Sequence, residues 1–191
     1  MRDRNLTDHR IEFVFGEVND QLKRELRAFW SQYGNAYQEE LRSFRIASRN
    51  SHGFEQIDLL KKPISRQPAA ISRDQSGAIN GIVFVVLREL ETSLELGSHA
   101  YFQRMYITPI ARHLTMNLSY QRLANQLFKA FLEGFDREVE KRDHRAKVLL
   151  SENINPGLQK ASMRRYFARL GFQMLAKFRQ CWLSLECIPN S

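Results

Sequence analysis

The stretch that decides the fold runs from Met105 to Asn117 and reads Met-Tyr-Ile-Thr-Pro-Ile-Ala-Arg-His-Leu-Thr-Met-Asn. The residues from His99 to Thr108 read as a strand, Pro109 stops that strand, and a short polar turn then opens a long helix. The turn therefore brings free backbone N–H groups, the side chain of Arg112 and a helix N-terminus to one place. A corner of this kind suits a phosphate group.

The segments on either side of this corner read as a helix and a hairpin. After the corner, apolar residues recur at three- and four-residue steps, which indicates an amphipathic helix. This apolar face consists of Tyr120, Leu123, Leu127, Phe128, Phe131, Phe135 and Val139. Before the corner, residues 68–73 and 78–87 flank the turn-forming residues Asp74-Gln75-Ser76-Gly77, and this pattern predicts a hairpin.

Periodicity also predicts the outer elements. Alternation indicates a first strand over residues 10–18, and a helix capped by Asn19 or Asp20 follows it, with an apolar face that reaches Phe44. A fifth strand covers residues 146–151. A further helix covers about 158–169 with Gly171 as its left-handed cap, and residues 173–187 contain the last strand or strands. This order of elements predicts a mixed α/β sheet covered by helices.

The size and composition of the chain indicate one domain. The 191 residues are 43% hydrophobic and contain no Pro/Gly/Ser-rich linker, so we expect a single domain over residues 1–191. Residues 45–67 are polar and irregular, and we expect an insertion there. A loop of this length is commonly functional or mobile, whereas a disordered insertion would look the same in the sequence, and both readings stay open.

Three segments, in this order, resemble the GNAT superfamily of N-acyltransferases. The first is the hairpin, with Asp-x-x-Gly at its turn and Ile79-Asn80-Gly81 after it. The second is Met105–Asn117, which resembles the family's acyl-CoA-binding segment except that Thr115 and Asn117 replace two glycines. The third is Tyr166–Phe172, which is similar to the family's Tyr-x-Lys-x-Gly-Phe signature. The resemblance implies a GNAT-like acyl-CoA N-acyltransferase fold, with a central, mostly antiparallel sheet flanked by helices.

The resemblance also implies how acetyl-CoA or another acyl-CoA would bind, without a metal. The backbone of Met105, Tyr106 and Ile107 is expected to hydrogen-bond the pantetheine arm. The turn is expected to offer N–H groups to the pyrophosphate, through Arg112, His113, Leu114, Thr115, Met116 and Asn117. Asn155 and Phe167 are assigned to the same cofactor site. Glycine allows close backbone approach in such a turn, and Asn visits the left-handed region more readily than β-branched Thr.

Acyl transfer to an amine requires that the amine be neutral. A lysine-like amine, with a pKa near 10.4, pays about 4 kcal/mol for deprotonation near neutral pH, so we expect a general base. The family often places a Glu on its fourth strand, but this strand has no carboxylate. We therefore assign His99 first, by its intrinsic chemistry, and Glu95 second. The general-acid Tyr of the family falls on Phe167 here. Tyr166 is the candidate, although one residue rotates about 100° around a helix.

Charge and composition limit the partners. The net charge of +8 predicts attraction to anions such as CoA, an acidic acyl carrier protein, nucleic acid or a membrane surface, unless it marks only a solvated Arg-rich surface. We expect an N-acyltransferase in which the acceptor amine attacks directly in a ternary complex. The alternatives are an acyl-carrier-protein-dependent enzyme and a non-catalytic GNAT-fold binding or regulatory protein that contacts nucleic acid.

Several absences complete these expectations. No apolar run approaches the roughly 20 residues of a membrane span, and the five His show no metal-ligand spacing. Cys181 and Cys187 stand too far apart along one strand to form a disulfide, which predicts reduced thiols and a cytoplasmic location. The sequence leaves open whether the chain forms a homodimer.

Overall fold

The computed structural model describes residues 9–52, 60–90, 96–113, 119–152, 160–174 and 182–186. The strands are β1 (Arg10–Phe13), β2 (Leu60–Arg73), β3 (Ile79–Leu90), β4 (His99–Ile107), β5 (Ala146–Glu152), β6 (Gln173–Met174) and β7 (Trp182–Glu186). The helices are α1 (Asp20–His52), α2 (Pro109–His113), α3 (Ser119–Arg137) and α4 (Ala161–Arg169), and a 3-10 turn covers Val139–Lys141. The fold is mixed α/β, as the sequence predicts.

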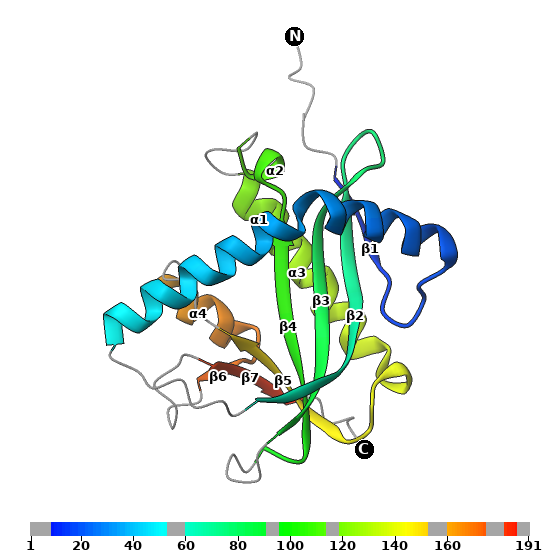
Figure 1. Cartoon of the computed structure of the whole chain (residues 1–191). Coiled ribbons are helices and arrows are strands. Elements are labelled where there is room, and N and C mark those ends of the chain that lie inside the picture. Colours follow the sequence, from blue (N-terminus) through cyan, green and yellow to red (C-terminus); the bar gives the residue numbers. More distant parts are fainter. Residues whose placement is uncertain are drawn as a thin grey trace. The chain divides into compact units, whose positions relative to one another are not determined.

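Within the described part of the chain, the strands form a seven-stranded sheet in the order β1-β2-β3-β4-β5-β7-β6 (Figure 1). β1 runs antiparallel to β2, and β7 runs antiparallel to both β5 and β6. β4 and β5 are parallel, and a parallel pair needs a long connection, which contains α2 and α3. The expectation of a mostly antiparallel sheet flanked by helices is confirmed.

The chain divides into two compact units. The first comprises Met1–Gly34, Gln67–Phe84 and Met105–Lys141, and the second comprises Asn35–Arg66, Val85–Arg104 and Arg142–Ser191.

The first unit is built on aromatic packing. The side-chain amide oxygen of Asn19 accepts a hydrogen bond from the N–H of Leu22 at 2.9 Å, so Asn19 is the predicted cap of α1. Further along α1, the ring centroids of Phe29 and Trp30 lie 6.1 and 6.3 Å from that of Tyr106 on β4. On α3, in the same unit, Phe131 and Phe135 are buried. Figure 1 shows α1 in front of β2 and β3 and α3 behind them.

The second unit contains the parallel strand pair and α4. β4 pairs with β5 from His99↔Ala146 to Gln103↔Ser151. The helix α4 ends at Gly171, whose φ of 87° is the left-handed value that the sequence predicts for its cap. The N–H of Phe172 then donates to the carbonyl of Phe167 at 3.1 Å, so the chain turns back immediately after the helix.

The predicted hairpin is confirmed and is longer than expected. The carboxylate of Asp74 accepts hydrogen bonds from the N–H groups of Ser76 and Ala78, at 2.9 and 3.1 Å, and Gly77 has a φ of 85°. This is the turn chemistry that an Asp-x-x-Gly sequence favours. Ser72 and Asn80, one on each strand, are joined through their side chains at 2.7 Å.

Three expectations need correction. The irregular insertion over residues 45–67 is largely regular, because α1 continues to His52 and β2 already begins at Leu60; residues 53–59 lie outside the described part. The sequence did not reveal this part of the helix, because its residues are mostly polar and lack the apolar periodicity from which a helix is predicted. The first strand is shorter than predicted and ends at Phe13. The short helix α2 was not predicted at all, because Pro109 was interpreted only as the end of a strand.

Candidate functional site

The corner after β4 is held by backbone and side-chain hydrogen bonds within the first unit. The hydroxyl of Thr108 accepts a hydrogen bond from the N–H of Ala111 at 3.3 Å, as a helix-capping residue does. Pro109 is the first residue of α2, where the missing N–H costs nothing. The N–H of Thr108 donates to the carbonyl of Asn80 at 2.9 Å. Thr-Pro at the end of a strand was the sequence signal that could have revealed this helix.

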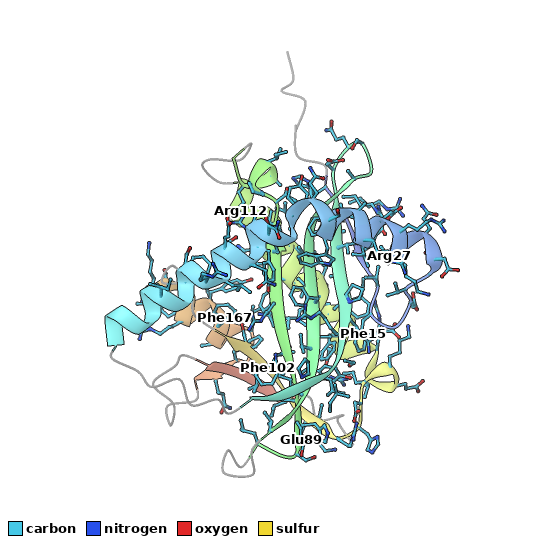
Figure 2. The ribbon with its side chains drawn as sticks, viewed as in Figure 1. Phe15, Arg27, Glu89, Phe102, Arg112 and Phe167 are labelled. Atoms are coloured by element: carbon cyan, nitrogen blue, oxygen red, sulfur yellow. The ribbon has the colours of Figure 1, made fainter. Side chains whose placement is uncertain are left out.

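Arg112 folds back onto the strand that precedes it (Figure 2). Its Nε donates a hydrogen bond to the carbonyl of Ile107 at 2.6 Å. Its guanidinium carbon lies 5.1 Å from the centre of the Tyr106 ring, within cation–π range. The corner therefore carries a cation that is positioned by two of the residues the resemblance assigns to pantetheine binding.

The expected acyl-CoA segment is described only in part. Tyr106 and Ile107 are buried, each 2% exposed, and Met105 is half-buried. His113 ends α2, and nothing is described of its side chain. Leu114, Thr115, Met116 and Asn117 lie outside the described residues, so their role at a phosphate stays a prediction.

A buried polar pair on β4 and β5 escaped the sequence reasoning. The amide nitrogen of Gln103 donates to the hydroxyl of Ser151 at 2.7 Å, and both side chains are buried. The amide oxygen of Gln103 is buried and finds no hydrogen-bond partner among the described residues. The pair lies at the last described β4–β5 register position, beyond which β4 continues to Ile107. A polar residue in the middle of an apolar strand was the available signal.

Of the two candidate bases, the structure describes His99 but not Glu95. His99 is buried, 9% exposed, and its Nδ1 lies 2.9 Å from the hydroxyl of Ser98. His99 begins β4 and Ile107 ends it, and the first and last residues of a nine-residue strand stand about 26 Å apart. Glu95 lies outside the described residues.

The candidate general acid is on α4, in the second unit. Tyr166 is half-buried, and burial raises the pKa of its phenol while the charge of Arg169 opposes this effect. Phe167, its neighbour, is 5% exposed and makes edge contacts with the rings of Tyr166 and Phe172, at 5.5 and 5.6 Å (Figure 2). The helix therefore buries the phenyl ring at the signature position and leaves the phenol beside it. Asn155 lies outside the described residues.

A cavity of about 780 Å³ opens in the first unit between α1, the β2–β3 turn and the corner. This volume is within the range of small-molecule sites. Its lining comes from His9, Glu25, Ala28, Phe29, Gln32, Tyr33, Arg73, Asp74, Gln75, Ser76, Gly77, Ala78, Ile79, Asn80, Thr108, Ile110 and Ala111. The sequence reasoning did not find this cavity, because its walls come from four separate segments.

Asn80 connects the cavity wall to the corner. Its side-chain oxygen accepts from the hydroxyl of Ser72, so its amide nitrogen is the group that faces Nδ1 of His9 at 3.1 Å. A neutral imidazole that accepts at Nδ1 carries its proton at Nε2. That Nε2 is buried, and no residue of the described ranges forms a hydrogen bond with it.

Metal sites and membrane spans were also sought in the described ranges. No group of three or more His, Cys, Asp and Glu residues in those ranges is arranged to bind a metal ion. None of the described helices has the length and apolar character needed to cross a bilayer.

Comparison with known proteins gives matches among solved structures only. No family model and no curated protein matches the chain. A GNAT-family acetyltransferase from Listeria monocytogenes is 13% identical, over 93% of this chain and 94% of that one, with a TM-score of 0.42. A GNAT-family acetyltransferase from Staphylococcus aureus is 12% identical, over 94% of this chain and 99% of that one, with a TM-score of 0.37. Over most of its length, this chain is therefore similar to solved GNAT acetyltransferases, at low identity and low TM-score.

Proposed function

We propose that the chain is a divergent GNAT-fold N-acyltransferase that moves an acyl group from an acyl-CoA thioester to an amine. The observation that carries this proposal is the corner formed by β4 and α2. It follows the Asp74–Gly77 hairpin and precedes the parallel strand β5, in the order that the motif resemblance implies. The strand β4 continues past its last described pairing with β5, and the cation of Arg112 lies at its end.

In the proposed complex the acyl donor lies along the end of β4. The backbone of Met105 to Ile107 hydrogen-bonds the pantetheine arm, and Arg112 with the following turn attracts the pyrophosphate. A half-buried guanidinium beside an aromatic ring is well suited to an anion, because Arg is weakly hydrated and presents its N–H groups in a planar fork. Residues 114–117, Asn155 and Phe167 keep their proposed places in the same donor site.

The proposed reaction is a direct displacement. The neutral nitrogen of the acceptor attacks the thioester carbonyl carbon, an N–C bond forms, the C–S bond breaks, and CoA leaves as the thiolate. The nitrogen loses one proton. His99, the first candidate base, begins β4 about 26 Å from Ile107, so it takes this proton only if the thioester reaches toward the start of the strand; Glu95 is the second candidate. The thiolate takes up a proton from water or from Tyr166. A thiol with a pKa near 8.5 is a tolerable leaving group even without help.

Titration of the purified protein with acyl donors tests the proposal. We expect acetyl-CoA or a longer acyl-CoA to raise the melting temperature in a concentration-dependent way, because the ligand binds only the folded state. Comparison with the matching acyl-phosphopantetheine shows whether the nucleotide contributes. Equal binding of both would favour an acyl carrier protein as the donor. If neither thioester binds, and nucleic acid binds with a steep salt dependence, the enzyme proposal is wrong and the binding-protein alternative stands.

A further inference from the structure

The only cation described on the cavity wall is already committed. Nε of Arg73 donates to Glu12 at 3.2 Å, Nη1 donates to the carbonyl of Gly77 at 2.9 Å, and Nη2 donates to Glu25 at 2.6 Å. All three nitrogens of the guanidinium are therefore engaged within the protein, and its charge is balanced by two carboxylates. A ligand anion entering the cavity would find no uncommitted Arg or Lys among the described lining residues.

Asp74, in contrast, has a carboxylate oxygen to spare. Its Oδ1 accepts three hydrogen bonds, from the N–H and hydroxyl of Ser76 and from the N–H of Ala78. Among the described residues, no hydrogen bond or ion pair engages Oδ2. The hydroxyl of Ser76, above all, holds the pKa of Asp74 below its ordinary value, so the group is ionised at neutral pH. The turn thus places an unpaired negative charge on the cavity wall.

Three other lining residues are apolar or aromatic. The rings of Phe29 and Tyr33, on α1, lie 5.2 Å apart, and both residues line the cavity. Ile110, at the start of α2, also lines it and is 60% exposed, which is unusual for so large an apolar side chain. Aromatic faces also attract an organic cation through their quadrupoles. The lining therefore combines one unpaired carboxylate with a surface for an apolar body.

We propose that this cavity binds an organic ammonium, with its charge at Asp74 and its hydrocarbon part against Phe29, Tyr33 and Ile110. The cavity borders the corner through Thr108 and Ala111, where the proposed donor carries its pyrophosphate and not its thioester, so this site is separate from the reacting groups. The binding of the cation does not rest on the proposed function.

Binding without any acyl donor tests the site itself. Pentylamine and diaminopentane carry the ammonium, pentanol is their neutral counterpart, and pentanoate carries the opposite charge. We expect both amines to bind about tenfold more tightly than pentanol, as a charge-assisted hydrogen bond of about 1.4 kcal/mol requires, and pentanoate to bind no better than pentanol. In the wild-type protein, the amide NMR signals of residues 74–78 and of Ile110 should shift with pentylamine.

Substitution of Asp74 assigns the effect to one carboxylate. Asp74→Asn keeps Oδ1, which can accept the same three turn hydrogen bonds, and removes only the charge. We expect this variant to lose about tenfold in amine affinity, to the level of pentanol, while Asp136→Asn, which removes an exposed charge from α3, changes nothing. Equal amine affinity in Asp74→Asn, signal shifts confined to other residues, or preferential binding of pentanoate would overturn the proposal.

Turnover separates this inference from the proposed function. If the amines bind at Asp74 but no acyl-CoA donor supports acyl transfer to any amine, the cation site stands and the proposed enzyme function is wrong. If acyl transfer occurs and Asp74→Asn leaves the affinity for both amines unchanged, the enzyme function stands and the cation site is wrong.

Discussion

Nε of Arg112 donates a hydrogen bond of 2.6 Å to the carbonyl of Ile107, so the last residue of β4 is bound by the helix that follows it. The same guanidinium lies over the ring of Tyr106. The carbonyl of Ile107 keeps a second lone pair, because a backbone oxygen accepts two hydrogen bonds. A pantetheine arm along β4 would therefore share this oxygen with Arg112, and one side chain would order both the strand end and the anion beside it.

Replacement of Arg112 should affect stability and donor binding together. Arg112→Ala removes a charged hydrogen bond and a cation–π contact, and we expect the free energy of unfolding to fall by about 2 kcal/mol. We expect the affinity for acyl-CoA to fall at least about tenfold, as measured by titration calorimetry. Arg27→Ala, which removes an exposed charge from α1 of the same unit, is the control (Figure 2). Unchanged acyl-CoA affinity in Arg112→Ala would show that this cation does not serve the donor.

Replacement of His99 tests the candidate base. If His99 takes the proton of the amine, His99→Asn should lower kcat by about a hundredfold in a steady-state assay. His144→Asn, at an exposed position of the second unit, should leave kcat unchanged. A kcat within about threefold of wild type would remove His99 from the mechanism.

Replacement of Tyr166 should matter little. Burial raises the pKa of this phenol, which therefore keeps its proton more strongly than in water. Even an ordinary phenol lies about 1.5 pKa units above a thiol, so donation to the CoA thiolate is uphill by about 2 kcal/mol. We expect Tyr166→Phe to lower kcat by less than about threefold at saturating donor. A loss of tenfold or more, with unchanged thermal stability, would make Tyr166 the general acid after all.

The ion pair of Glu25 with Arg73 should appear in the acid limb of stability. The hydrogen bond from Arg73, above all, holds the pKa of Glu25 below its ordinary value. A lowered carboxyl pKa contributes stability above the pKa of the unfolded chain, and this contribution is lost as the pH falls through the folded pKa. We expect Glu25→Gln to lose up to about 1 kcal/mol at neutral pH, and to lose less than wild type on acidification below about pH 5.

Urea unfolding at several pH values measures this difference. Glu39→Gln, at an exposed position of the same helix, should follow the wild-type curve. Parallel wild-type and Glu25→Gln curves over the whole acid range would mean that the pair contributes no pH-dependent stability.

Two glycines in helices should respond in opposite directions to alanine. A Cβ at Gly134 of α3 would overlap the ring of Phe13 on β1, whereas a Cβ at Gly34 of α1 has no neighbour within 4 Å. We expect Gly134→Ala to destabilise the protein by about 1 to 2 kcal/mol, because overpacking outweighs the gain in helix propensity. Gly34→Ala should stabilise it by up to about 1 kcal/mol. Chemical denaturation measures both, and a stabilising Gly134→Ala would show that α3 and β1 do not pack this closely.

Local sequence determined the elements whose signals are contained in a few residues. Asn19 caps α1, Asp74 and Gly77 form the hairpin turn, and Gly171 ends α4, because each residue satisfies backbone groups close to it in the chain. The strand β4 was also predicted, over His99 to Thr108, and the structure has it at His99–Ile107. The helix α2 was missed because Thr108 and Pro109 can end a strand or begin a helix, and only the hydrogen bond from Ala111 to Thr108 decides which.

The sequence alone therefore determined the order of strands and helices and the corner at which the chain leaves β4. The tertiary structure alone decided what that corner contains. The contacts of Asn80 with Ser72 and His9, and the engagement of Arg73 by Glu12 and Glu25, join residues that no spacing rule connects. The physical reason is that a cavity and its charge balance depend on which side chains from distant segments meet, and hydrogen-bond partners are assigned only when those segments pack.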